Sequence, residues 1–188
     1  MELLNNFKNN FKNERKMLNS QRLAGSKKIR SYNLAEHSYF VGLLFQEVCD
    51  FLDVEFTTDI FGKVLRHDFM EVFTADLPYP VKNFNEKTKD AWKVIENELY
   101  KDSETITENP YLIDDQTISK DLSLGEFHIL RWCDIVELLY FCLEEYDMGN
   151  SSLEGVIQKC VEIAESISID YPPLKQLTKK YVLEEVNE

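Results

Sequence analysis

Residues 65–82, LRHDFMEVFTADLPYPVK, bring four ionisable side chains into a short stretch: His67, Asp68, Glu71 and Asp76. The packing of an apolar helix does not need such a group, because a charge that is buried without a partner costs several kcal/mol. Imidazole and carboxylate groups are, however, common ligands of divalent transition metals. The residue types and their spacing therefore predict a metal site in this stretch.

Two more residues of the same chemical kind fall on apolar helix faces. His37 precedes Val41 by one turn in a helix that the capping box of Asn33 and Glu36 is predicted to open. Taken alone, such a histidine is more often a hydrogen-bonded core residue than a ligand. Asp134 interrupts the apolar stripe of a helix predicted over 122–146, which reads Phe127, Leu130, Asp134, Leu138 and Phe141. A carboxylate buried there needs a cation, either an Arg or Lys side chain or a metal ion.

His37, His67, Asp68 and Asp134 together form a set of nitrogen and oxygen ligands that suits Mn, Co, Fe, Ni or Zn. Consecutive residues of a helix point about 100° apart, so His67 and Asp68 converge on one ion only near a helix end. The prolines in residues 76–81 predict that end, since each lacks a backbone N–H and forces the preceding residue to be extended. We expect this prolyl segment to be a stiff loop that lines a pocket.

Composition limits the fold and the partners. The 188 residues contain 6 glycines and 5 prolines, and 44% are hydrophobic, which predicts one mostly helical domain over 1–188. A formal net charge of −13 argues against DNA or RNA as a partner. The spacing of the four cysteines indicates buried free thiols. We see no targeting segment and no apolar run long enough to cross a membrane, so we expect a cytoplasmic protein.

The remaining elements are predicted from periodicity and caps. An amphipathic helix opens the chain, with Leu4, Phe7, Phe11 and Leu18 near helical spacing. A basic link at 27–30 follows, with its lysines expected in solvent. A helix capped near Thr57 is expected to carry His67 and Asp68 in its C-terminal part. Further helices are predicted over 86–103, up to about 168, and from Tyr171 onward, with a polar stretch at 103–121.

Longer motifs point to a known family. They are Arg22, RSYNLAEHS at 30–38, HDFMEVFTADLPYPVK at 67–82, VIENEL at 94–99 and CDIVELLYFCLEEYDMGN at 133–150. The chain resembles the HD-domain phosphohydrolases, and in particular the bacterial 5′-deoxynucleotidase family, which cleaves deoxyribonucleoside monophosphates. The resemblance implies an all-α helical bundle of about six to eight helices that assembles into a homodimer or a higher homo-oligomer.

The resemblance also implies a role for each matching residue. One divalent metal would be held by His37, His67, Asp68 and Asp134, three of which (His37, Asp68 and Asp134) would also lie against the substrate. Glu71, Asp76 and Arg22 would be the catalytic group. The remaining substrate contacts would come from Arg22, Leu23, Asp76, Leu77, Pro78, Tyr79 and Lys82.

The residue chemistry agrees with these roles. Glu71 lies one helical turn beyond His67, where it can orient a water molecule or carry a proton. Arg22 and Lys82 can hold a phosphate. Asp76 can accept a hydrogen bond from a sugar hydroxyl or take part in proton transfer. His128 falls on a different face from Asp134, and we interpret it as structural.

Two departures from the family pattern stand out. Leu23 replaces a Trp that follows the arginine, and Ala75 replaces a Gly in a turn, a change that we expect to be minor.

Two alternatives to a 5′-deoxynucleotidase stay open at this point. One is a dNTP triphosphohydrolase that uses the same metal site, and the other is a nucleotide-sensing module without turnover.

Overall fold

The computed structural model describes residues 2–77, 79–82, 84–107 and 122–187. Its first half contains α1 (Glu2–Glu14), η1 (Arg15–Leu18), α2 (Leu34–Leu52), α3 (Thr58–Val64), α4 (Glu71–Thr74), α5 (Tyr79–Lys82) and α6 (Glu86–Thr107). Its second half contains α8 (Leu124–Asp147), η2 (Ser151–Leu153), α9 (Glu154–Asp170), η3 (Pro172–Leu174), α10 (Lys175–Thr178), η4 (Lys179–Glu184) and η5 (Glu185–Asn187). These ranges contain no β-strand, and a single antiparallel bridge joins Gln21 to Asn33. The expected all-α fold is confirmed.

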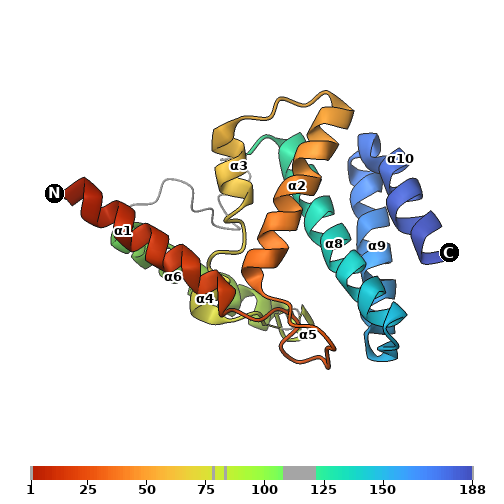
Figure 1. Ribbon diagram of the computed structural model, residues 1–188, viewed down its shortest axis with the longest axis horizontal. Helices are drawn as coiled ribbons and strands as arrows, with labels where there is room; N and C mark the ends of the chain where they lie inside the picture. Colours follow the sequence, from red (N-terminus) through yellow and green to blue (C-terminus); the bar gives the residue numbers. More distant parts are fainter. Residues whose placement is uncertain (1, 78, 83, 108–121, 188) are drawn as a thin grey trace.

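The long helices form two groups. Figure 1 shows α2, α8, α9 and α10 side by side, while α1 and α6 extend away on the side opposite the C-terminus. The helix α8 lies at the centre of the first group and packs against both α2 and α9. Its buried side chains include Ile129, Trp132, Val136 and Leu139, so α8 is buried on more faces than the predicted stripe alone. Within the described ranges, no helix combines the length and apolarity that crossing a membrane requires.

Two helices start at the predicted caps. Asn33 and Glu36 form the predicted capping box of α2, and Thr57 caps α3 by accepting a hydrogen bond from the N–H of Ile60 at 3.2 Å. The helix α8 begins at a second capping box, made by Ser123 and Glu126. Each cap satisfies backbone N–H groups that have no partner inside the helix. Local sequence therefore determines where these helices start.

Two predicted boundaries and one predicted stripe differ from the structure. The helix from Thr57 ends at Val64, so His67 and Asp68 lie in the tight turns that follow it. The helix predicted over 86–103 continues to Thr107, and 108–121 lie outside the described residues. The opening helix is present, but the side chain of Phe11, one of its predicted apolar positions, is 54% exposed and so is not part of a buried stripe.

The prolyl segment is also more ordered than predicted. Residues Tyr79–Lys82 form one helical turn, α5, where we expected only loop. Pro80 is the second residue of this turn, and the first N–H groups of a helix have no intrahelical partner to lose. The physical argument against helix in this segment therefore holds for a longer helix but not for a single turn.

The link between η1 and α2 is anchored at both its base and its tip. At the base, Arg22 N–H donates to Tyr32 C=O at 2.9 Å. At the tip, the carboxylate of Glu145 in α8 accepts the N–H groups of Ile29 and Arg30 at 2.7 and 2.8 Å. Asn150 Nδ2 also donates to Glu145, at 2.7 Å. This link carries Arg22, so the end of α8 helps to hold the predicted phosphate-binding residue in place.

Replacing Glu145 by alanine is expected to destabilise this link. The side chain is fully buried, and losing three hydrogen bonds to a charged acceptor costs on the order of 3 kcal/mol. That loss corresponds to a fall in Tm of roughly 6–12 °C for a chain of this size. The matched control is Glu144→Ala, because Glu144 is exposed and pairs with the half-exposed Arg30, a contact worth at most about 1 kcal/mol.

The effect of Glu145 should also depend on pH. Burial disfavours its charged form, but the N–H groups of Ile29 and Arg30 lower the pKa of Glu145 below its ordinary value. A lowered carboxylate pKa adds stability above the ordinary pKa and loses it as pH falls through the folded-state pKa. Thermal melts of wild type and Glu145→Ala should therefore differ most at neutral pH and converge in acid. Equal Tm values at pH 7 would contradict the anchoring role.

Candidate metal centre

Three separate segments bring the four predicted ligands together. His37 comes from the first turn of α2, His67 and Asp68 from the turns after α3, and Asp134 from the middle of α8. One ligand atom from each residue lies within 4.8 Å of all the others. His37 Nε2 lies 3.1 Å from Asp134 Oδ1 and 3.6 Å from Asp68 Oδ2, and His67 Nε2 lies 3.4 Å from Asp68 Oδ2. These separations are close to those between ligand atoms that each lie about 2 Å from one shared ion.

The turns between α3 and α4 explain how adjacent residues converge. Arg66, His67, Phe69 and Glu71 each donate their N–H to the carbonyl three residues earlier, in tight 3₁₀-type bonds. The chain is thereby wound more tightly than an α-helix, and the directions of successive side chains change. His67 Nδ1 contacts the carbonyl of Val64 at 2.9 Å, which leaves Nε2 as the ligand nitrogen.

The buried polar atoms without a hydrogen-bond partner fit a metal. Among them are His37 Nε2, His67 Nε2 and Asp134 Oδ1, the atoms that face one another in this cluster. Buried polar atoms in native proteins nearly always have a partner, so three unpaired atoms at one point call for a ligand. Two imidazoles and two carboxylates suit a divalent transition ion, and the residues therefore fit the metal that the sequence predicts.

Arg22 supplies positive charge beside this cluster. Its Nη1 pairs with Asp68 Oδ2 and lies 3.4 Å from Glu71 Oε2, and its Nη2 lies 3.6 Å from Asp134 Oδ1. Burial disfavours the ionised Asp134, but the two histidines and Arg22 hold its pKa well below the usual range. Three carboxylates nevertheless face one guanidinium. Once the two imidazoles are neutral, as metal ligands must be, the excess negative charge is of the kind that a divalent cation neutralises.

Glu71 is buried at the edge of the cluster, although it is not one of the four grouped ligands. It begins α4, and 8% of its surface is exposed. Burial and the neighbouring Asp68 raise the pKa of Glu71 to about 7, against the opposing influence of Arg22 and Lys82. A carboxyl that titrates near neutrality can both accept and donate a proton at working pH. These are the properties expected of an acid–base group.

Lys82 lies on the other side of Glu71. Its Nζ is 3.6 Å from Glu71 Oε1 and 3.8 Å from Glu96 Oε1, and it lies 5.7 Å from the centre of the Trp92 ring. Trp92 Nε1 in turn donates a hydrogen bond to Glu96. Sequence reasoning assigned no role to Trp92 or Glu96. The sequence shows that these two residues lie one helical turn apart, but it does not show which other element α6 packs against.

The segment that follows α4 contacts the arginine link. Asp76 Oδ2 accepts the N–H of Leu23 at 2.6 Å, so Asp76 joins the two segments. Leu23 has a φ of 51°, and its half-buried side chain packs against the main core. Leu77 is half-buried, whereas Pro78 and the side chain of Tyr79 lie outside the described residues. The contacts of these two with a substrate therefore stay a prediction.

The change at Ala75 is larger than expected. Ala75 has φ 59° and ψ 165°, a conformation that glycine adopts freely and that strains a residue with a Cβ. The departure is therefore a strained turn directly before Asp76, and the expectation of a minor change is wrong.

His128 stacks on Tyr171 with ring centres 5.5 Å apart and is not one of the grouped ligands, which agrees with a structural role.

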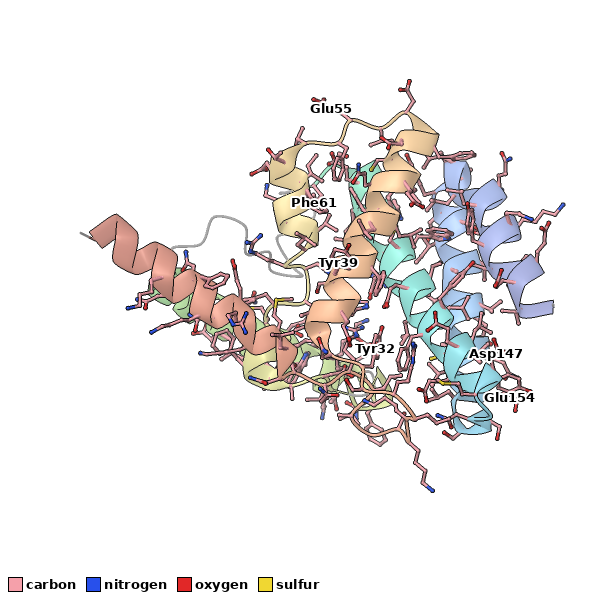
Figure 2. The ribbon with its side chains drawn as sticks, in the orientation of Figure 1. Tyr32, Tyr39, Glu55, Phe61, Asp147 and Glu154 are labelled. Carbon is pink, nitrogen blue, oxygen red and sulfur yellow. The ribbon has the colours of Figure 1, made fainter. Side chains whose placement is uncertain are left out.

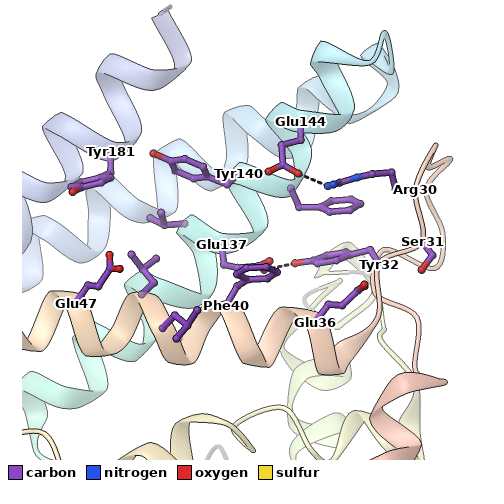
Figure 3. Close-up of a pocket in the computed structure, with 14 residues that line it drawn as sticks. Arg30, Ser31, Tyr32, Glu36, Phe40, Glu47, Glu137, Tyr140, Glu144 and Tyr181 are labelled. Carbon is purple, nitrogen blue, oxygen red and sulfur yellow. Dashed lines mark hydrogen bonds and ion pairs between the residues drawn. The ribbon is translucent and has the colours of Figure 1, made fainter.

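A cavity of about 700 Å³ lies between α2 and α8, where Tyr32 and Glu137 form part of its wall (Figure 3). Glu137 contacts His37 Nδ1, and Tyr32 donates a hydrogen bond to the same carboxylate. Sequence reasoning missed both residues. The available signal was weak: Glu137 follows Asp134 by three positions and so lies on the same side of α8.

Solved structures define the class of fold. An HD-domain phosphohydrolase from Listeria innocua aligns with a TM-score of 0.63 and 25% identity over 94% of this chain and 85% of that one. The cyanophage S-2L HD phosphohydrolase DatZ, solved with dA and one catalytic Zn²⁺ ion, aligns with a TM-score of 0.59 and 16% identity over 90% and 96%. The chain therefore has the HD-domain phosphohydrolase fold.

Sequence comparison then defines the family. The profile described as 5′-deoxynucleotidase YfbR-like matches residues 9–182. A 5′-deoxynucleotidase of Pasteurella multocida is 30% identical over 142 residues, 72% of this chain and 73% of that protein. Another, from Klebsiella pneumoniae, is 27% identical over 153 residues, with 76% and 77% covered. The chain belongs to the YfbR-like 5′-deoxynucleotidase family, and the resemblance stated from its motifs is confirmed.

Proposed function

We propose that this protein is a metal-dependent enzyme that hydrolyses the 5′-phosphate of (deoxy)ribonucleoside monophosphates to nucleoside and phosphate. The observation that carries the proposal is the placement of Glu71, a buried carboxyl with a pKa raised to about 7, beside the four-residue cluster and Arg22. A site for binding alone does not need an acid–base group at that position. Membership of the 5′-deoxynucleotidase family supports the same reaction.

Each residue has a task in this reaction. His37, His67, Asp68 and Asp134 would hold one divalent ion (Mn, Co, Fe, Ni or Zn), which supplies Lewis-acid chemistry and an activated water. Glu71 takes up or returns the proton that moves during hydrolysis. Arg22 and Lys82 hold the phosphate oxygens through charge-assisted hydrogen bonds. Asp76, with Leu23, Leu77, Pro78 and Tyr79, contacts the nucleoside.

A product assay tests the proposal against its alternatives. The purified protein is incubated with nucleoside mono- and triphosphates in the presence of Mn²⁺, Co²⁺, Mg²⁺ or Zn²⁺. We expect orthophosphate and nucleoside from monophosphates. Tripolyphosphate from dNTPs would favour a triphosphohydrolase, and binding without any product would favour a nucleotide-sensing module.

The departure at Leu23 predicts a change in sugar selection. Leucine is smaller than the family's Trp and has no aromatic face, so the pocket beside Arg22 should admit a 2′-hydroxyl more readily. Changes in one hydrophobic contact are worth only about 1–3 kcal/mol in discrimination. We therefore expect weak preference for dAMP over AMP in the wild type and roughly tenfold or greater sharpening in Leu23→Trp.

The measurement is kcat/KM for dAMP and for AMP in both proteins. Phosphate release from each good substrate should keep its metal dependence, because the substitution leaves the ligands unchanged. If the wild type already rejects AMP several hundredfold, or if Leu23→Trp gives the same ratio as the wild type, then Leu23 does not determine sugar choice.

Assembly and location are part of the proposal. We expect residues 1–188 to act as one domain in a cytoplasmic homodimer or larger homo-oligomer. Several apolar side chains on and before α6 support self-association, since they are exposed in the single chain: Val81, Phe84, Val94 and Ile95. Sedimentation analysis of the purified protein would give its mass in solution.

A further inference from the structure

A carboxylate that is not one of the four ligands contacts one of them, His37, at the ring nitrogen that faces away from the predicted ion. Glu137 lies on α8 one turn after Asp134, and its Oε2 contacts Nδ1 of His37, a residue 100 positions earlier in the chain. The opposite ring nitrogen, His37 Nε2, faces Asp134 at 3.1 Å and Asp68 at 3.6 Å. His37 is thus held at one nitrogen and directed toward the predicted ion at the other.

Tyr32 fixes the position of this carboxylate. Its hydroxyl donates to Glu137 Oε2 and lies 3.1 Å from His37 Nδ1. The Tyr32 ring stacks on Phe141 with centres 3.9 Å apart and planes 10° apart. Figure 2 places Tyr32 between the start of α2 and α8, and Figure 3 shows its contact with Glu137 at the wall of the cavity. With Nε2 as the metal ligand, the proton of His37 is on Nδ1, so two donors then converge on one oxygen of Glu137.

The two histidines differ in how their outer nitrogen is held. His67 Nδ1 contacts a backbone carbonyl, that of Val64, whereas His37 Nδ1 contacts a side-chain carboxyl oxygen, that of Glu137. A carboxylate behind a metal-bound imidazole orients the ring, selects its tautomer and makes the ligand nitrogen more basic. A side-chain partner can be replaced by mutation, and a backbone carbonyl cannot.

We infer that Glu137, held by Tyr32, is a positioning residue that presents His37 Nε2 to the metal ion. The inference rests on the metal site of the proposed function and adds to it a residue that contacts neither the ion nor the substrate. Because Glu137 acts through His37, its loss should weaken metal binding first and reduce activity at limiting metal as a consequence.

Titration of the metal-free full-length protein with Co²⁺ tests this role. Glu137→Gln keeps the size of the side chain and removes its charge, and we expect a Co²⁺ affinity about 10- to 100-fold weaker than that of the wild type. Tyr32→Phe keeps the ring stack and removes the hydroxyl, so a smaller loss in the same direction is expected. The absorption spectrum of bound Co²⁺ provides a second readout, because it reports ligand geometry and not folding.

The matched control is Glu144→Gln. Glu144 lies two turns later on α8 and lines the same cavity, but it pairs with Arg30 and not with His37. Its Co²⁺ affinity should equal that of the wild type. Affinity within threefold of the wild type in Glu137→Gln would overturn the role of Glu137. A wild type that takes up no Co²⁺ would instead overturn the metal site of the proposed function, so the two failures are distinguishable.

Discussion

Asp134→Ala is expected to abolish metal binding and to lower kcat/KM by about 10³-fold or more. Asp134 is the ligand that α8 contributes, and its Oδ1 lies 3.1 Å from His37 Nε2 and 3.9 Å from His67 Nε2. Without it the remaining carboxylate ligand, Asp68, is also paired with Arg22. A metal ion supplies several kcal/mol of transition-state stabilisation, and each 1.36 kcal/mol corresponds to about tenfold in rate.

Elemental analysis of the purified variants checks this result. His67→Ala should lose its metal in the same way, because His67 comes from a different segment but points to the same place. The control is Asp147→Ala, an exposed aspartate at the end of the same helix (Figure 2), which should keep wild-type occupancy and activity. Near-normal metal content in both Asp134→Ala and His67→Ala would show that the ion, if any, is held elsewhere.

Glu71→Gln is expected to reduce kcat by roughly 10²-fold or more while the metal content stays unchanged. A positioned acid–base group contributes about 10²- to 10⁴-fold, and the amide cannot exchange a proton near neutral pH. The substitution keeps the shape of a buried side chain, so we expect no large change in Tm. The loss should therefore appear in kcat and not in folding or in metal binding.

Single-turnover rates and metal analysis of the same sample separate these effects. Glu98→Gln serves as the control, because Glu98 is 68% exposed and pairs with Lys101 on the surface of α6. Turnover close to the wild-type rate in Glu71→Gln would move the proton-transfer role to another carboxyl. Asp76 is then the first to test, since it lies near enough to influence the pKa of Glu71.

Two contacts in the site join distant parts of the chain. Arg22 meets Glu71 across 49 positions, and Glu137 meets His37 across 100. Helical periodicity indicates which residues share a face of one helix, but it does not indicate which faces of two helices meet. For this reason the sequence predicted that Asp134 needs a cation without deciding between an Arg or Lys side chain and a metal ion. In the structure Asp134 faces Arg22, and the unpaired nitrogens of both histidines also face it.

The sequence by itself determined the helical class, the main helix starts and the four metal-ligand candidates. These depend on local properties: few glycines and prolines, capping residues such as Asn33 and Thr57, and ligand types at helical spacing. Only the tertiary structure decided how His67 and Asp68 converge, because tight turns replace the helix expected there. It also placed Glu137 behind His37 and Trp92 beside Lys82, because such contacts depend on how α2, α6 and α8 pack.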